Sequence, residues 1–314
     1  MKILQNITLK IDHCLIYYFI KMEYMHMFPS DDGHHISRRL AIIAFGVSVG
    51  FIACGCPGGA AEPERLRLGG TGMTLATMRR IAEAFVSTAP GTTVEVLPSL
   101  GSAGGIAAVA AGAIDLGLSA RALTPAERGK GLRERAYART PIAFVTHPAK
   151  TRCEIGFAQV IGILAGTLTT WPDGTPVRLV RREPSDADWI MLQDLSPDFA
   201  AAVAVARQRP GLLTATTDQE NADMLERLHG SFGMISIGQL RAENRQLAPF
   251  ALDGVRPEPE ALAGGRYKLA RTLRVIWRDL PGRGLSAFLD FLQGPQAHDI
   301  LTRLGHLSPV DGVS

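Results

Sequence analysis

Four short segments that follow expected strands carry hydroxyl residues, two of them together with glycine and two together with arginine. They are residues 71–74, 100–105, 119–121 and 180–186. The first backbone N–H groups of a helix lack partners within the helix and carry partial positive charge, so a helix start without side-chain bulk can hold a small anion. The arginines of the last two segments would add fixed charge. Together the segments predict an anion site, although the 100–105 loop by itself also fits a tight turn with close helix–strand packing.

Residue types that serve catalysis or metal binding occur without the partners that such chemistry needs. Residues 117–121 depart from the G-x-S-x-G pattern of hydrolases, with arginine in place of the last glycine, and no Walker sequence is present. The histidines outside the first sixty residues fall in no recognisable motif. Cys153 has no partner in the body of the chain and is expected to be a buried apolar residue. The sequence therefore predicts no catalytic residue, no metal site and no cofactor.

The elements that must position the four segments alternate between strand and helix. Expected strands are residues 65–68, 93–97, 113–119, 140–146, 177–182, 232–238 and 269–277. Expected helices are residues 73–88, the stretch after the 100–105 loop, 155–165, two within 187–208, 218–228, 283–293 and 295–304. This alternation predicts an α/β fold of two lobes joined by crossing strands, with a mostly parallel sheet. Ligands of such folds lie at the carboxyl ends of strands, which puts the four segments at one cleft.

Arg181 and Arg182 follow one another on an expected strand, so only one of them can point into the cleft. The aromatic side chain of Trp171 is expected to pack in the second lobe.

Composition narrows the function further. The chain has 314 residues, 46% hydrophobic and 20% charged, which is ordinary for a globular protein. A net charge of +3 is too small to indicate a nucleic-acid surface. We therefore expect no nucleic-acid partner.

The first sixty-one residues are expected to be a leader. Residues 37–39 read Ser-Arg-Arg and precede an uncharged apolar run, 40–53, which suits a secretory signal and is shorter than the roughly twenty residues of a membrane-spanning helix. Cys54 fits lipidation as the first residue of a lipoprotein, while 59–61 (Gly-Ala-Ala) fits ordinary signal-peptide cleavage. Both routes predict export, and the stretch before Ser37 is explained by a start site placed too far upstream.

Several stretches in order resemble the phosphate-type substrate-binding proteins of ABC importers, the PstS-like group. They are GGTGMT, LGSAGGIAAVAAGAIDLGLSAR, FAQVIGILAGTLTTWPDGTPVRLVRR, FGMISIG, ALDGV, YKLARTLRVIW and FLDFLQGPQAHDIL followed by GHLSPV. The resemblance covers nearly all of residues 65–310. It implies a type II periplasmic-binding-protein fold, in which two lobes close on a tetrahedral oxyanion, most simply phosphate. The implied protein is a monomer that delivers this anion to an ABC permease in the inner membrane. The implied location is periplasmic or anchored outside the inner membrane.

The lobes implied by this resemblance are residues 62–146 with about 251–314, and about 147–250. A sensor that reports phosphate, sulfate, a phosphonate or molybdate without transporting it would need the same cleft, so the sequence leaves that alternative open. A hydrolase is the least favoured reading.

Site residues also follow from the resemblance. Thr74, Ser102, Arg182 and Ser185 match positions that contact phosphate in the family, and Leu75 falls where a backbone contact is made. Arg121 is similar to an arginine common in the shorter members.

Two departures from the family pattern concern acidic residues. Ala120 stands where many relatives have the aspartate that accepts a proton from phosphate. Where relatives continue Ser-Gly-Thr, this chain has Ser185, Asp186, Ala187 and Asp188. A carboxylate beside a dry anion is costly unless a proton bridges them, so Asp186 is either a relocated acceptor or the mark of a changed ligand. It also fits a simple helix cap.

Overall fold

The computed structural model describes residues 64–149 and 154–309. The expected leader with its lipidation candidate Cys54, and the expected buried Cys153, lie outside the described residues. Within the described ranges, no helix is both long enough and apolar enough to cross a membrane.

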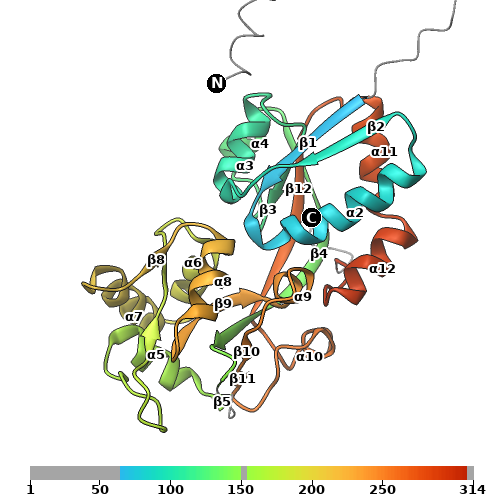
Figure 1. Ribbon diagram of the computed structural model, residues 1–314. Coiled ribbons are helices and arrows are strands. Elements are labelled where there is room, and N and C mark those ends of the chain that lie inside the picture. The colour runs from blue at the N-terminus through green and yellow to red at the C-terminus, as the bar shows by residue number, and fades with distance from the viewer. Residues whose placement is uncertain (1–63, 150–153, 310–314) are drawn as a thin grey trace, which may run out of the picture. The chain divides into compact units, whose positions relative to one another are not determined.

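Strands of the described structure fall into one large and two small sheets. Their bounds are β1 Glu64–Gly70, β2 Thr92–Val96, β3 Leu116–Ser119, β4 Leu132–Thr146, β5 Glu154–Ile155, β6 Arg178–Leu179, β7 Arg181–Arg182, β8 Thr214–Ala215, β9 Ser231–Ser236, β10 Ala248–Pro249, β11 Ala251–Leu252 and β12 Ala270–Arg278. The large sheet has the order β2-β1-β3-β12-β4-β9-β6, with β10 paired to β4 (Figure 1). The small sheets are β5 with β11 and β7 with β8.

The expectation of a mostly parallel sheet is wrong. β1 pairs in parallel with β2 and β3, and β6 with β9. The two longest strands, β4 and β12, pair antiparallel with each other and with their other neighbours. The chain returns through β12 into the middle of the sheet, which places an antiparallel strand between β3 and β4.

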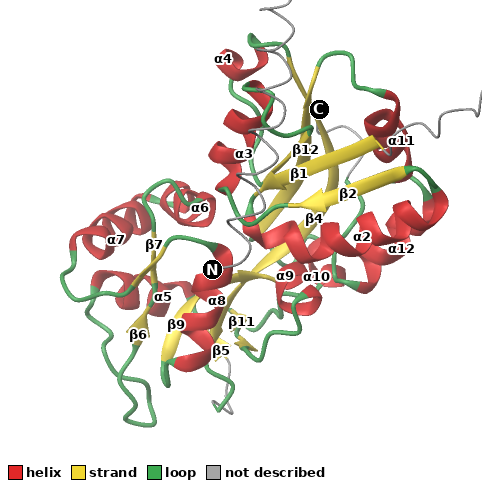
Figure 2. Cartoon of the chain, turned by 45° about the horizontal axis from the view of Figure 1, so that its top comes forward, coloured by secondary structure: helices red, strands yellow, loops and turns green. Residues whose placement is uncertain are grey.

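Helices pack against the large sheet (Figure 2). Their bounds are η1 Gly72–Thr74 (a 3-10 turn), α2 Leu75–Thr88, α3 Gly101–Ala110, α4 Pro125–Arg128, α5 Phe157–Ala165, α6 Ala187–Leu195, α7 Pro197–Gln208, α8 Asp218–Arg227, α9 Ile237–Ala242, α10 Pro259–Ala263, α11 Arg283–Phe291 and α12 Pro295–Arg303. In α2, the apolar residues at helical spacing (Leu75, Met78, Ile81, Ala82 and Phe85) are all buried, as their spacing predicts.

The apolar side chains gather in two main clusters. One joins β1, β3 and α2 to the C-terminal helices, where Phe85 meets Phe288 edge-to-face at 5.1 Å between ring centroids. The other holds Trp171, which stacks on Phe250 at 5.5 Å and donates from its indole N–H to the Gly230 carbonyl at 3.0 Å. The predicted packing role of Trp171 is confirmed.

β4 contributes to both parts of the sheet. Residues 132–141 pair with β12, and residues 142–145 continue beyond it to pair with β9. The sequence prediction found only residues 140–146, because the first half of the strand reads LRERAYAR and its charged residues hide the apolar alternation. Two of these charged side chains form ion pairs with residues outside the strand: Arg133 pairs with Asp279, and Glu134 pairs with Arg128.

Small residues let α3 lie directly against β1. A Cβ added to Gly105 would sit 2.7 Å from the Cα of Gly70, and one added to Gly70 would sit 2.0 Å from the Leu118 carbonyl oxygen. Gly70 also has φ +152°, which side chains rarely adopt. The close-packing interpretation of this glycine-rich region is therefore confirmed, and it places the start of α3 beside the end of β1.

A buried histidine ties the chain's last segment to α2. The imidazole Nε2 of His306 lies 3.1 Å from the Thr77 hydroxyl, and the side chain is 1% exposed. Burial, with a smaller contribution from the charge of Arg241, lowers the pKa of His306 to about 4.

We expect this histidine to make the fold less stable in acid. Between pH 6.5 and 4 the unfolded chain binds a proton at this position and the folded chain does not. The free energy of unfolding therefore falls by about 3 kcal/mol as the pH falls through that window. Urea unfolding of wild type and His306→Gln from pH 7 to 4 measures the difference between the two profiles. Parallel profiles would contradict the prediction.

Candidate functional site

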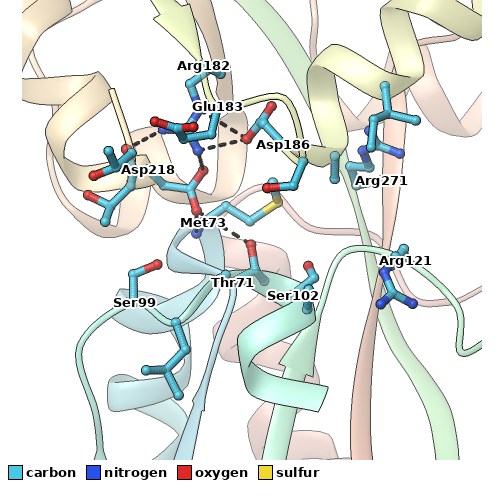
Figure 3. A pocket seen from close by; sticks show the side chains of 18 residues that line it. Thr71, Met73, Ser99, Ser102, Arg121, Arg182, Glu183, Asp186, Asp218 and Arg271 are labelled. Atoms are coloured by element: carbon cyan, nitrogen blue, oxygen red, sulfur yellow. Dashed lines mark hydrogen bonds and ion pairs between the residues drawn. The ribbon is translucent and has the colours of Figure 1, made fainter. Parts of the chain in front are cut away.

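One cavity of about 350 Å³ brings most of the predicted site residues together (Figure 3). It opens between the ends of β1 and β3, the start of α3 and the segment after β7. Its lining is Thr71, Met73, Ser99, Leu100, Gly101, Ser102, Ala103, Arg121, Arg182, Glu183, Ser185, Asp186, Ala187, Ile190, Thr216, Thr217, Asp218 and Arg271.

The start of α3 opens onto this cavity as the sequence predicts. Leu100 is the N-cap residue, and no side chain caps the helix. Residues 101–103 line the cavity, so the first turn faces it with little bulk. The Ser102 hydroxyl accepts a hydrogen bond from the Ala120 N–H at 3.0 Å, which ties the helix to the end of β3. An uncapped helix start with partial positive charge is suited to a small anion.

Arg121 lies at the cavity edge with its guanidinium held by Glu127. The two side chains share two hydrogen bonds of 2.8 and 2.7 Å. Glu127 also completes the capping box of α4 with Thr124. The hydrogen bonds from Arg121 lower the pKa of the Glu127 carboxyl to about 2. The charge of Arg121 is therefore largely neutralised before any ligand arrives.

Of the two consecutive arginines on β7, Arg182 points into the cavity and Arg181 points away. Arg181 donates to the Thr214 hydroxyl and to the Arg207 carbonyl, each at 2.8 Å. Arg182 is 9% exposed and lines the cavity. The prediction that only one of the pair can face the cleft is confirmed.

Asp186 is a helix cap. Its Oδ1 accepts from the N–H groups of Asp188 and Trp189, each at 3.1 Å, and so begins α6. Its Oδ2 accepts from Arg182 at 3.0 and 2.8 Å. Ser185 beside it is exposed and lines the cavity. The cap interpretation is thus observed directly, while the acceptor role stays a prediction.

Thr74 and Leu75 do not line the cavity. The Thr74 hydroxyl donates to the Thr71 carbonyl at 3.3 Å, and the Leu75 N–H donates to the Gly72 carbonyl as η1 closes. Thr71 faces the cavity in their place, because the 3-10 turn directs residues 74 and 75 into the core.

Sequence reasoning missed two charged residues of the cavity, Asp218 and Arg271. Asp218 begins α8 and contacts Arg182 at 3.0 Å. Arg271 on β12 donates from Nε to Asp188 at 2.9 Å, and its buried Nη2 has no hydrogen-bond partner among the described residues. Asp218 could have been found as an acidic residue at the start of an expected helix. Arg271 could have been found as an arginine near the start of an expected strand.

The side-chain charges of the cavity are balanced. Three arginines and three acidic residues line it: Arg121, Arg182, Arg271, Glu183, Asp186 and Asp218. Burial, together with the nearby charges of Asp186 and Asp188, raises the pKa of the Asp218 carboxyl to about 6, although Arg182 opposes this. Burial also raises the pKa of Asp188. Within the described ranges, no group of three or more His, Cys, Asp or Glu residues could hold a metal.

Comparison with known proteins gives a family and several relatives. A model of the PBP superfamily domain matches residues 57–296. Phosphate-binding protein PstS 2 of Streptococcus pneumoniae is 34% identical over 107 residues, which is 34% of this chain and 36% of that protein. The matched stretch thus spans about a third of the relative's length.

Solved structures share the architecture. A phosphate ABC transporter substrate-binding protein with bound phosphate from Clostridium perfringens has a TM-score of 0.69 and 21% identity, over 78% of this chain and all of that one. An ABC-type phosphate transport receptor from Vibrio cholerae has a TM-score of 0.57, with the same identity and coverage. The match over residues 57–296 and this shared architecture show that the chain belongs to the PBP superfamily and has the type II periplasmic-binding-protein fold.

Proposed function

We propose that the chain is an exported binding protein that captures phosphate, or a similar tetrahedral oxyanion, for an ABC importer. The observation that carries this proposal is the cavity of about 350 Å³ between the uncapped start of α3 and the Arg182 segment. Thr71, Ser102, Ser185 and Arg271 line the same space, with three hydroxyls and a guanidinium among their side chains. These donors suit the oxygens of a small anion.

The carboxylates of the cavity favour an anion that carries a proton. Glu183, Asp186 and Asp218 would repel a fully ionised anion such as sulfate, since burial weakens the screening of their charge. A protonated oxyanion donates a hydrogen bond to a carboxylate and converts that repulsion into a contact. Phosphate holds such a proton at neutral pH and sulfate does not, so phosphate is the preferred ligand.

Closure of two lobes on the anion is part of the proposal. The two apolar clusters support it, since one draws on residues up to Ala138 and from Leu273 onward and the other on residues from Ile142 to Leu269. We accordingly place the return between lobes at the start of β12, near residue 270, later than the residue 251 expected from sequence. Export, a monomeric state and delivery to a permease are also part of the proposal, and the transport role named for one relative supports the last of them. Those relatives are named as binding proteins, which supports binding without catalysis.

A thermal-unfolding titration with phosphate, sulfate, a phosphonate and molybdate from pH 5 to 8 tests the function. Phosphate at a hundred times its dissociation constant should stabilise the fold by about 2.7 kcal/mol. Arg271→Gln should weaken phosphate binding about tenfold or more, because it removes a charge-assisted donor from the cavity. The matched control is Arg278→Gln on the same strand, which is exposed and away from the cavity.

Each outcome has a defined meaning. The proposal is supported if phosphate stabilises wild type and Arg278→Gln equally and stabilises Arg271→Gln less. Stabilisation by a different anion alone would overturn phosphate as the ligand. Asp186→Asn keeps an oxygen for the α6 cap and removes the charge, so a selective loss of phosphate over sulfate would identify Asp186 as the proton acceptor.

A further inference from the structure

Three donors beside the cavity are already occupied by a carboxylate of the chain itself. Asp218 lies between Arg182 and the turn that follows β1 (Figure 3). Its Oδ1 accepts from Arg182 at 3.0 Å and its Oδ2 accepts from the Met73 N–H at 2.9 Å. The Thr71 hydroxyl donates to the same Oδ2 at 3.5 Å. A guanidinium, a backbone N–H and a hydroxyl are the partners that an oxyanion would take.

The start of α8 packs closely against the turn that follows β1. Gln219 donates to the Gly72 carbonyl at 2.9 Å, so two consecutive residues of α8 hold the turn. A Cβ added to Gly72 would lie 2.7 Å from the Asp218 Oδ2. An anion therefore reaches the Met73 N–H only when the Asp218 carboxylate leaves it.

The charged groups around Asp218 act in opposite directions. Arg182 on β7 stabilises its ionised form, while Asp186 and Asp188 at the start of α6 disfavour it. Among the described residues of η1, the group that meets Asp218 is the neutral Met73 N–H. Burial dominates, and the pKa of about 6 means that Asp218 titrates near physiological pH.

We propose that Asp218 is an internal competitor of the bound anion, which takes over Arg182 and the Met73 N–H by displacing the Asp218 carboxylate. This inference rests on the proposed function and adds to it a residue that limits affinity. Once displaced, the carboxylate remains in the same cavity as the anion, so binding favours its protonated form. Anion binding is therefore coupled to proton uptake by Asp218.

The size of the effect follows from the fraction of Asp218 that is protonated. If only the protonated form admits the anion, a pKa of about 6 leaves roughly 3% of the chain competent at pH 7.5 and roughly 90% at pH 5. Asp218→Asn should then bind phosphate roughly 30-fold more tightly than wild type at pH 7.5 and with nearly equal affinity at pH 5. Asp218→Ala should behave in the same way. Comparison at one pH cancels the ionisation of phosphate itself.

Isothermal titration calorimetry of the purified chain with inorganic phosphate at pH 5.0, 6.0 and 7.5 measures these affinities. Asp223→Asn is the matched control, since Asp223 lies on the same helix and pairs with Arg245 outside the cavity. The control should follow wild type at every pH. In wild type, the carboxyl ¹³C signal of Asp218 should titrate near pH 6 without phosphate and at higher pH when phosphate is saturating. That measurement decides the question even if the Asp218 variants do not fold.

The outcomes separate this inference from the proposed function. If wild type binds phosphate and Asp218→Asn binds no more tightly at pH 7.5, Asp218 is no competitor and the inference is overturned. Weaker binding by the variant would make Asp218 a direct ligand contact, which also overturns it. An unchanged Asp218 titration on phosphate binding would have the same consequence. If no form binds phosphate at any pH, the proposed function itself fails.

Discussion

Replacing Arg182 by alanine should lower the free energy of unfolding by about 3–5 kcal/mol at pH 7. Arg182 pairs with Asp186 at 2.8 Å and with Asp218 at 3.0 Å, and it also donates to the Thr217 carbonyl. The side chains of the two aspartates are 10% and 13% exposed. Without the guanidinium they become neighbouring buried charges with no counter-ion, which is the costly arrangement.

The loss in Arg182→Ala should shrink in acid. The pKa of Asp218 is already raised by burial, and removing its cation raises it further. In the variant Asp218 therefore takes up its proton at a higher pH than in wild type, so lowering the pH from 7 through about 6 stabilises the folded variant more than folded wild type. Urea unfolding at pH 7 and pH 5 measures the change, and anion binding should be lost at both.

Arg181→Ala is the matched control for this experiment. It removes the same side chain from the adjacent position of β7, where Arg181 bonds to Thr214 and Arg207 outside the cavity. We expect a loss of about 1–2 kcal/mol that does not depend on pH over this range. Equal losses for the two variants, or a loss in Arg182→Ala that is the same at pH 5 and 7, would disprove the role assigned to the buried carboxylates.

Gly70→Ala should destabilise the fold by roughly 3 kcal/mol or more. The added methyl group would lie 2.0 Å from the Leu118 carbonyl oxygen, and the backbone at residue 70 has φ +152°. Residue 70 pairs with Leu118 in the β1–β3 ladder, so relief of the clash requires these strands to separate. The end of β1 carries Thr71 into the cavity, so anion binding should fall as well.

Two glycine variants divide this effect into its parts. Gly91 has φ +93° with nothing within 4 Å of an added Cβ, so Gly91→Ala should cost only the backbone strain of about 1 kcal/mol. Gly129 has φ −61° and no atom closer than 3.5 Å, so Gly129→Ala should be neutral or slightly stabilising. Urea unfolding of all three variants gives the comparison. A loss in Gly70→Ala no greater than in Gly91→Ala would show that β1 and β3 absorb the clash.

The elements of the fold are largely readable from the sequence. Periodicity places α2 and its buried face correctly, and the small residues after Leu100 predict both the uncapped helix start and its close packing. Strand alternation predicts that only one of Arg181 and Arg182 faces the cleft, and the family resemblance selects Arg182. These features depend on neighbours within a few residues along the chain, which is where sequence patterns carry their information.

The contents of the cavity are decided by contacts between distant parts of the chain. Met73 and Asp218 are 145 residues apart in sequence, and Arg271 and Asp188 are 83 apart. No local pattern marks such pairs. Their geometry depends on β12 returning to the middle of the sheet and on α8 meeting the turn after β1.

The sequence by itself determined the α/β alternation, the four segments that converge on one cavity and the family resemblance. Only the tertiary structure decided that the sheet is mixed, that Thr74 and Leu75 lie outside the cavity, and that Asp218 holds the Arg182 guanidinium. The physical reason is that helices and strands form from local spacing of apolar residues, whereas a buried charge is stable only where folding brings a counter-charge to it.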